Sequence, residues 1–325
     1  MSKSLWADLL DSWAAEMTTE TALSERSIRA YLADAEAFAA WAEAQGIEGP
    51  EQVTTADVRE WRDSGAAGKA PSTVNRRLVS VALLLDHAGR TGRSNPARRV
   101  PRLTDVAPSD EGRALTLSEW RAVRRAAEAA GQLETALVCL LRYAGPRVGE
   151  IAPETARDPC PLLLGDITIG PRSGEVVIRR GKGAKRRRVP LVLEAREALT
   201  TYLDGERRQR LDAWVIRGRL PAAQREWWDG PSAPVIIGER GPLTVRGVRH
   251  IVERLGRDAR LPYTLGPHDL RATFITALVD PEKYGLRKEA MPLHVAARLA
   301  GHASVDTTAR YAAPSLDDLA RWMDD

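Results

Sequence analysis

The segment GHASVDTTARY places Tyr311 nine residues after His302. A phenol can attack a phosphorus atom, hold the phosphoryl group as a stable diester, and leave again when a second hydroxyl attacks. A nearby imidazole can move the phenol proton or donate to a phosphate oxygen. The pair therefore predicts phosphodiester chemistry, with Tyr311 as the nucleophile and His302 beside it.

Two arginines lie in short segments upstream of this pair. Arg147 follows a Gly-Pro turn in AGPRVGE, and Arg271 ends HDLR, which begins at His268. Displacement at phosphorus builds negative charge on the nonbridging oxygens, and a guanidinium presents a planar donor fork that matches phosphate. We therefore expect Arg147 and Arg271 to bind the phosphate, with His268 as a further donor or proton carrier.

A leaving 5′ oxygen needs a proton, and a lysine on a hairpin can deliver it. Lys182 in GKGAK fits this role by position, and Lys185 in the same segment is the alternative. Glu150 comes three residues after Arg147, which would place both on one helical face. We expect Glu150 to orient a neighbouring donor.

Each of these residues has an ordinary structural alternative when it is taken alone. An arginine after a turn is usually solvated, and the basic run 179–188 has the composition of an exposed charged face. A tyrosine commonly buries its ring with its hydroxyl bonded, and isolated histidines are often structural. The occurrence of all four segments in one chain, in this order, favours the catalytic interpretation.

Together the four segments resemble the tyrosine recombinase family, which is phage integrase-like and Xer-like. The segments STVNR and Asn95-Pro96 resemble parts of the family's core-binding domain. This sequence has Ala144, Pro146 and Ala300 where the family more often has Thr, Leu and Leu. None of these differences removes a chemical group, so they concern local geometry and subfamily.

The resemblance implies a mainly α fold with a small antiparallel β-sheet, in which a helical, SAM-like core-binding domain precedes an α+β catalytic domain. It implies a site-specific recombinase or integrase that breaks and rejoins double-stranded DNA through a 3′-phosphotyrosine and a Holliday junction. It further implies a dimer on each site and a tetramer in the synapse, without a metal or other cofactor. Simple recombinases of this kind act on short inverted repeats, and we expect no additional arm-binding domain.

Charge and composition agree with a nucleic-acid partner. The chain has a net charge of +4, and residues 68–103 and 170–190 each hold eight basic residues against one acidic residue. No window is apolar enough for a membrane span, and the N-terminus does not read as a secretory signal. The two cysteines lie in no CxxC arrangement. We therefore expect a cytoplasmic protein associated with the nucleoid.

The pattern of apolar residues divides the chain into a helical domain over 1–95, a basic linker over 96–113, and a catalytic domain over 114–325. Thr55 is expected to cap a helix and Ser72 to begin one, and Thr116 with Glu119 predicts a capping box. Strands are expected at 166–169, 175–179, 187–191 and 235–237, and an insertion at 205–232. A final amphipathic helix, carrying Leu316, Leu319 and Met323, would dock either on its own domain or on a neighbouring protomer.

Several basic side chains outside the catalytic set are expected to contact DNA, although a solvated face is the alternative for each. They are Arg76, Arg77, Lys185, Arg186 and Arg188. Trp227 and Trp228 could stack on bases, but packing within the insertion is favoured.

Three other functions remain open on the sequence alone. A type IB topoisomerase uses nearly the same chemistry to relax supercoils without strand exchange. A non-catalytic relative would bind DNA without covalent attachment, and a transcription regulator would do so through the helix of Arg76 and Arg77. The target DNA sequence is not predicted.

Overall fold

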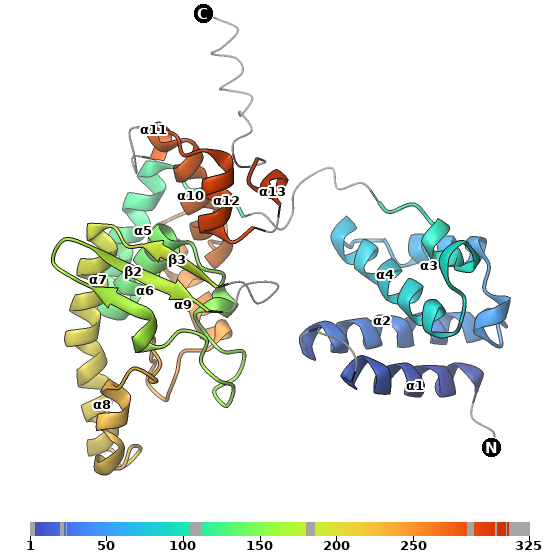
Figure 1. The fold of residues 1–325 in the computed structure, drawn as a ribbon, viewed down its shortest axis with the longest axis horizontal. Helices are drawn as coiled ribbons and strands as arrows, with labels where there is room; N and C mark the ends of the chain where they lie inside the picture. The colour runs from blue at the N-terminus through green and yellow to red at the C-terminus, as the bar shows by residue number, and fades with distance from the viewer. Residues whose placement is uncertain are drawn as a thin grey trace, which may run out of the picture. The chain divides into compact units, whose positions relative to one another are not determined.

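The structure is a computed structural model that describes residues 4–19, 23, 25–103, 112–179, 186–284, 289–302, 304–309 and 311. The chain divides into two compact units, Met1–Ser109 and Asp110–Asp325, and each has its own hydrophobic core. Figure 1 shows the order of the elements in both units. No helix in the described part of the chain is long and apolar enough to cross a membrane.

The described part of the first unit contains four α-helices, in agreement with the helical domain that the sequence predicts. Their core is aromatic: Phe38 lies at ring-centroid distances of 5.8 Å from Trp6 and 5.2 Å from Trp61, edge-to-face in both pairs. Such contacts join three helices through one buried side chain. The helices are α1 (Leu5–Thr19), α2 (Glu25–Ala44), α3 (Thr55–Ser64) and α4 (Pro71–His87).

The predicted cap of α3 and the predicted start of α4 are each displaced by one residue. Thr54, not Thr55, caps α3, because its hydroxyl accepts from the Asp57 amide while the Asp57 carboxylate accepts from the Thr54 amide. The reciprocal pair uses two amides that have no partner within the helix. Helix α4 begins at Pro71 rather than Ser72, since proline's fixed φ suits the first helical position.

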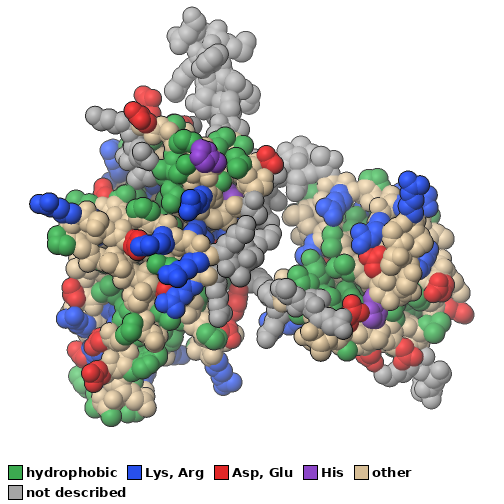
Figure 2. All heavy atoms as spheres, in the orientation of Figure 1, with side chains coloured by type: hydrophobic (Ala, Val, Ile, Leu, Met, Phe, Trp, Pro, Cys, Tyr) green, Lys and Arg blue, Asp and Glu red, His purple; other side chains and the backbone are tan. Residues whose placement is uncertain are grey.

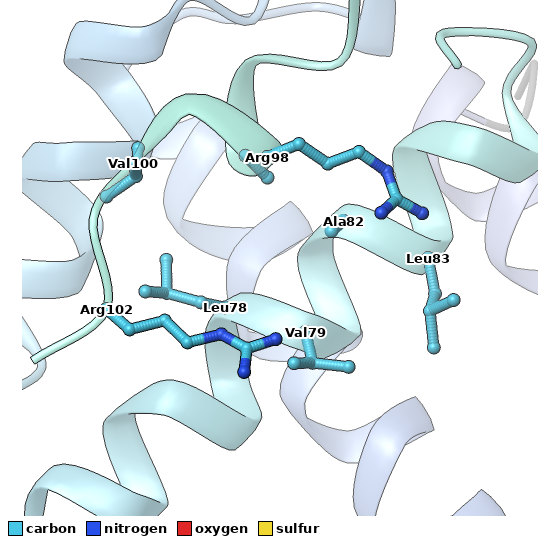
Figure 3. Close-up of a pocket in the computed structure, with 8 residues that line it drawn as sticks. Leu78, Val79, Ala82, Leu83, Arg98, Val100 and Arg102 are labelled. Carbon is cyan, nitrogen blue, oxygen red and sulfur yellow. The ribbon is translucent and has the colours of Figure 1, made fainter. Parts of the chain in front are cut away.

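A groove lies on the first unit between α4 and the turn that follows it (Figure 3). Its walls are mainly apolar, and two arginines border it. Arg98 is paired with Asp86 of α4, which is not among the residues that line the groove. None of the residues predicted to act in catalysis lines the groove. The lining residues are Leu78, Val79, Ala82, Leu83, Ala97, Arg98, Val100 and Arg102.

In the second unit, nearly every residue of α6 (Gln132–Ala144) is buried. Helix α6 packs against α5 (Leu117–Ala130), α7 (Leu193–Asp204) and α10 (Pro267–Val279), so it forms the centre of the core. The predicted capping box begins α5: the Thr116 hydroxyl accepts from the Glu119 amide, and the Glu119 carboxylate from the Thr116 amide. The remaining helices are α8 (Glu206–Ile216), α9 (Val245–Asp258), α11 (Pro281–Tyr284), α12 (Leu293–Ala300) and α13 (Val305–Ala309).

A three-stranded antiparallel sheet in the order β1-β2-β3 completes the second unit. The strands are Ile167–Ile169, Gly174–Ile178 and Arg187–Pro190. Val176 pairs with Ile167 on one side and with Val189 on the other. The three predicted strands are confirmed with slightly different ends, and the fold class is confirmed.

The fourth predicted strand is wrong. Val235, Ile236 and Ile237 are buried, but this run makes isolated bridges, Leu163 with Pro234 and Ile237 with Pro242. An apolar run is therefore placed in the core by burial alone, without a continuous ladder. The predicted final helix lies outside the described residues.

The predicted insertion is built around α8 and a small apolar cluster. The Trp214 and Trp228 rings meet at 5.1 Å, and Trp227 meets Trp228 at 5.3 Å, both edge-to-face. Trp228 therefore packs within the insertion. Trp227 is 53% exposed.

Candidate active site

The turn that presents Arg147 depends on a glycine. Gly145 ends α6 in the left-handed conformation at φ +57, where its amide donates to the Leu141 carbonyl. A Cβ at Gly145 would lie 2.1 Å from the Phe274 ring, so any side chain would collide there. Glycine is therefore required both by the positive φ and by the close approach of the Phe274 ring. The chain turns sharply here, and Arg147 follows three residues beyond the buried end of α6.

Arg147 is held by Glu150. The Arg147 amide donates to Glu150 Oε2 at 2.7 Å, and Arg147 Nη1 donates to Oε1 at 3.1 Å. Arg147 Nη2 also donates to the Gly301 carbonyl at 3.3 Å. The 3₁₀ turn Val148–Glu150 makes this possible, in place of the α-helical face that the spacing suggested.

Glu150 is buried and charged. Burial alone would raise the pKa of its carboxyl, but the hydrogen bonds and charges of Arg187 and Arg147 outweigh burial and hold the pKa below its usual range. The carboxylate thus stays ionised at neutral pH and remains an acceptor for both guanidiniums.

Helix α10 carries the HDLR segment. His268 lies in its first turn and is exposed, whereas Arg271 one turn later is buried. Arg271 donates to the Gly145 carbonyl and, at 2.6 Å, to the Ala300 carbonyl. Burial, with a smaller contribution from Arg147, lowers the pKa of Arg271 to about 9, so the guanidinium remains a cation at neutral pH.

The end of the linker also contacts α10. A Cβ at Gly112, whose φ is +58, would lie 2.6 Å from the His268 carbonyl, so the chain passes directly against the start of this helix. The Arg113 amide donates to Asp269, and the buried Leu115 amide donates to the Thr273 hydroxyl. These contacts fix the start of α10, and with it the position of His268.

His302 follows a second left-handed glycine. Gly301 ends α12 at φ +69, and the His302 amide then donates back to the Ala297 carbonyl. His302 Nδ1 is 2.8 Å from the hydroxyl of Thr308, a buried residue of α13. Because Nδ1 is engaged there, Nε2 is the nitrogen that remains for a ligand.

Tyr311 stacks on His302, with ring centroids 6.1 Å apart and an interplanar angle of 23°. The tyrosine is half-buried against the main core, and its electrostatic effect on Arg271 opposes the lowering of that arginine's pKa by burial and by Arg147. The structure therefore brings together Arg147, Glu150, Arg271, His302 and Tyr311, while His268 lies on the first turn of the helix that carries Arg271.

Two neighbours of this cluster were not predicted from the sequence. Arg187 of β3 donates to both oxygens of Glu150, and Thr308 bonds to His302. The sequence held a signal for the first: Arg187 and the buried Val189 are two residues apart, and alternate residues of a strand share a face. No comparable signal singled out Thr308.

The remaining predicted residues of the second unit either lie outside the described residues or are exposed. Lys182 and Lys185 lie outside the described residues. Arg186 and Arg188 are exposed, and Arg188 pairs with Glu175. Figure 2 shows Lys and Arg side chains gathered over the sheet of the second unit.

The two arginines of α4 have partners within the first unit. Arg76 pairs with Asp34 and donates to the Ala30 carbonyl. Arg77 lies 4.4 Å above the Trp61 ring and donates to the Gly65 carbonyl. Their contact with DNA stays a prediction.

The cluster has the donors that phosphoryl transfer needs. Arg147 and Arg271 act electrostatically on each other and on His302, and the half-buried imidazole of His302 stacks on the phenol. Burial, followed by the charges of Arg271, Arg147 and Arg187, lowers the pKa of His302 to about 4. A neutral imidazole at physiological pH can accept a proton or donate one through Nε2.

This low pKa gives a testable pH dependence. The unfolded chain takes up a proton on His302 near pH 6.5, while the folded protein does so near pH 4. Between these values the unfolded state binds more protons, so the free energy of unfolding rises with pH across the window. We expect NMR titration to give a His302 midpoint more than one unit below 6.5, and His302→Gln to flatten the pH dependence of stability there. A midpoint at or above 6.5 would contradict the buried geometry.

Comparisons with known proteins identify the family of the chain. The family model of the phage integrase family matches residues 114–317, and that of the phage integrase N-terminal SAM-like domain matches residues 10–92. The chain therefore belongs to the phage integrase family, the tyrosine recombinases. It is a site-specific recombinase, an enzyme of DNA strand exchange.

The tyrosine recombinase XerC of Rhodospirillum centenum is 30% identical to this chain over 94% of this chain and 82% of the relative. Among solved structures, XerH site-specific recombinase bound to palindromic difH substrate in a post-cleavage complex is similar, with a TM-score of 0.64 and 18% identity over 97% of this chain and 83% of that one. A lambda integrase tetramer bound to a Holliday junction gives a TM-score of 0.63 and 16% identity over 95% and 77%.

Proposed function

We propose that Tyr311 is the nucleophile of recombination and that Arg147 and Arg271 bind the scissile phosphate. The observation that carries this is the arrangement of a half-buried phenol, stacked on His302, beside a buried guanidinium held by two backbone carbonyls. Positioned cations stabilise the charge that develops on phosphate oxygens in the transition state.

In the proposed step, Tyr311 Oη attacks phosphorus and its proton passes to a base, a role that we assign to neutral His302 because its ring stacks on the phenol. The bond to the 5′ oxygen breaks, and that oxygen takes a proton from Lys182, or from Lys185 as the alternative. The product is a 3′-phosphotyrosine and a free 5′-hydroxyl. His268 donates to a phosphate oxygen from the exposed start of α10.

A 5′-hydroxyl from the partner duplex then attacks the phosphotyrosine, and a second round resolves the resulting Holliday junction. The phosphodiester energy is kept in the covalent bond, so each exchange is a transesterification. We propose two protomers on each double-stranded site and four in the synapse. A lambda integrase dimer bound to a COC′ core site and a lambda integrase tetramer bound to a Holliday junction are complexes of this kind. The protein would act in the cytoplasm at the nucleoid, where duplex DNA is found.

The nucleophile is tested by trapping the covalent intermediate. A binding site is first enriched from a random duplex library, and a nick is then placed so that the short fragment leaves after cleavage. We expect a stable protein–DNA adduct whose digested peptide carries a nucleotide on Tyr311. An adduct on another residue would overturn the assignment, and a chain that binds but forms no adduct would favour the non-catalytic alternative.

Two exposed arginines at the start of β3, Arg186 and Arg188, give a prediction about DNA binding. If Arg186 and Arg188 each neutralise one phosphate, replacing either by Gln should reduce the slope of log binding constant against log salt concentration by about 0.9. Arg172→Gln is the matched control, because this exposed arginine lies at the opposite end of the sheet. Titrations by fluorescence anisotropy at several salt concentrations measure the slopes. Equal slopes for all three variants would contradict the proposed contact.

A further inference from the structure

Arg187 is a buried arginine that pairs with a buried carboxylate next to the proposed active site. Its Nη1 donates to Glu150 Oε1 at 2.9 Å, and its Nη2 donates to Glu150 Oε2 at 2.7 Å. Both side chains are less than a tenth exposed. Two parallel bonds of this kind fix the carboxylate in orientation as well as in position.

The same two oxygens hold Arg147. Glu150 Oε2 accepts from the Arg147 amide, and Oε1 accepts from Arg147 Nη1. The Glu150 carboxylate thus accepts hydrogen bonds from two arginines. Because Arg187 fixes the orientation of the carboxylate plane, it also fixes the direction of the hydrogen bonds between Glu150 and Arg147. Arg147 is the more exposed of the two, with 28% of its side chain accessible, so it is the one that can meet a phosphate.

Arg187 also lies against the turn that precedes His302. A Cβ at Gly301 would come within 2.8 Å of Arg187 Nη1, so the guanidinium packs directly on this glycine. The Gly301 carbonyl accepts from Arg147 Nη2. Arg187 therefore contacts Glu150 and Gly301, the two groups that bind the Arg147 guanidinium.

We propose that Arg187 is a positioning residue for recombination, which orients Glu150 and Gly301 so that the Arg147 guanidinium is aligned with the scissile phosphate. This role rests on the proposed function of Arg147. Arg187 also begins β3, two residues after Lys185 and five after Lys182.

Stability alone accounts poorly for this arrangement. A buried ion pair gains little over an apolar pair of similar size, because both ions lose their hydration. Removing one partner is costly, since the other charge is left unpaired in the interior. Arg187→Gln would therefore lose stability as well as alignment, and the two effects must be separated.

A second buried arginine provides the matched control. Arg207 donates to the Trp228 carbonyl in the insertion and to the Pro234 and Val235 carbonyls just after it, and none of these residues belongs to the proposed site. Arg207→Gln should lower thermal stability while leaving the cleavage rate of folded protein on saturating nicked DNA unchanged. Arg187→Gln should lower that rate by about 10- to 100-fold, as the loss of an orienting partner does at other sites, with the DNA dissociation constant within about threefold of wild type.

The double variant Glu150→Gln/Arg187→Met separates folding from alignment further. It removes both members of the buried Arg187–Glu150 pair, so neither is left unpaired in the interior and stability should recover in part, while the cleavage rate should stay low. Arg187→Lys retains the charge without the fork and should recover part of the rate. Rates at saturating DNA close to wild type for Arg187→Gln, or recovery of the rate together with stability in the double variant, would overturn the proposal.

A measurement without DNA tests the same geometry. The Arg187 charge is one of those that lower the pKa of His302, so Arg187→Gln should raise the His302 midpoint in an NMR titration, and Arg187→Lys should leave it low. An unchanged midpoint in Arg187→Gln would place the guanidinium away from the site and contradict the proposal.

If wild type forms no Tyr311 adduct, the proposed function fails and the alignment role fails with it. If wild type forms the adduct and Arg187→Gln cleaves normally, the positioning role fails alone.

Discussion

Replacing Tyr311 by phenylalanine is expected to abolish the covalent protein–DNA adduct while leaving DNA binding within about threefold of wild type. The substitution removes one oxygen and keeps the ring that stacks on His302 and packs on the core. Loss of a nucleophile that acts together with its neighbours commonly costs several orders of magnitude, so the cleavage rate should fall by at least about 10⁴-fold. The measurements are adduct formation on the nicked substrate and binding by anisotropy.

Tyr263→Phe is the matched control. Tyr263 is another half-buried tyrosine of the second unit, and its ring lies under the Arg113 guanidinium rather than beside His302. This variant should cleave at the wild-type rate. Adduct formation by Tyr311→Phe would mean that another residue attacks the phosphate, and loss of DNA binding in that variant would mean that the hydroxyl has a structural role.

The candidate site could be predicted from the sequence because its residues lie in short segments whose geometry is local. Gly145 and Gly301 each end a helix at positive φ, and each precedes a functional side chain by one or two residues. A glycine followed by Arg147 or by His302 is therefore a local feature that a single sequence displays. The sequence does not show that the ends of α6 and α12 meet α10. That contact is made by Arg271, which donates to the Gly145 and Ala300 carbonyls.

Residues whose roles depend on long-range partners were harder to predict. Arg186, Arg187 and Arg188 are chemically identical in the sequence, and only the buried Val189 distinguishes the inward one. Arg76 illustrates the opposite case, because its basic segment suggested a surface for DNA, yet its guanidinium pairs with Asp34. Charge composition cannot show which acidic group an arginine will reach.

Replacing Arg271 by lysine is expected to slow cleavage by about 10²- to 10³-fold at saturating DNA, the usual cost of losing an aligned donor to a developing oxyanion. Arg271 donates to the Gly145 and Ala300 carbonyls through two separate nitrogens of its guanidinium. A lysine ammonium has a single nitrogen and cannot reach both carbonyls with the same geometry. The burial that lowers the pKa of Arg271 to about 9 would also lower the pKa of a lysine there, and lysine starts from a lower value.

The Arg271→Lys defect should consequently deepen as the pH rises, because the lysine loses its proton while wild-type Arg271 remains charged. Single-turnover cleavage rates measured from about pH 6.5 to 8.5 test this. The whole range lies below the ordinary pKa of lysine, so a lysine with an unshifted pKa would keep its proton throughout. Arg207→Lys is the matched control, since burial also lowers the pKa of Arg207 and its guanidinium likewise donates to backbone carbonyls. That variant should lose stability without a change in the pH profile of cleavage. A uniform loss at all pH values would indicate that the fork geometry of Arg271, rather than its charge, limits the rate, and a wild-type rate would remove Arg271 from the phosphate site.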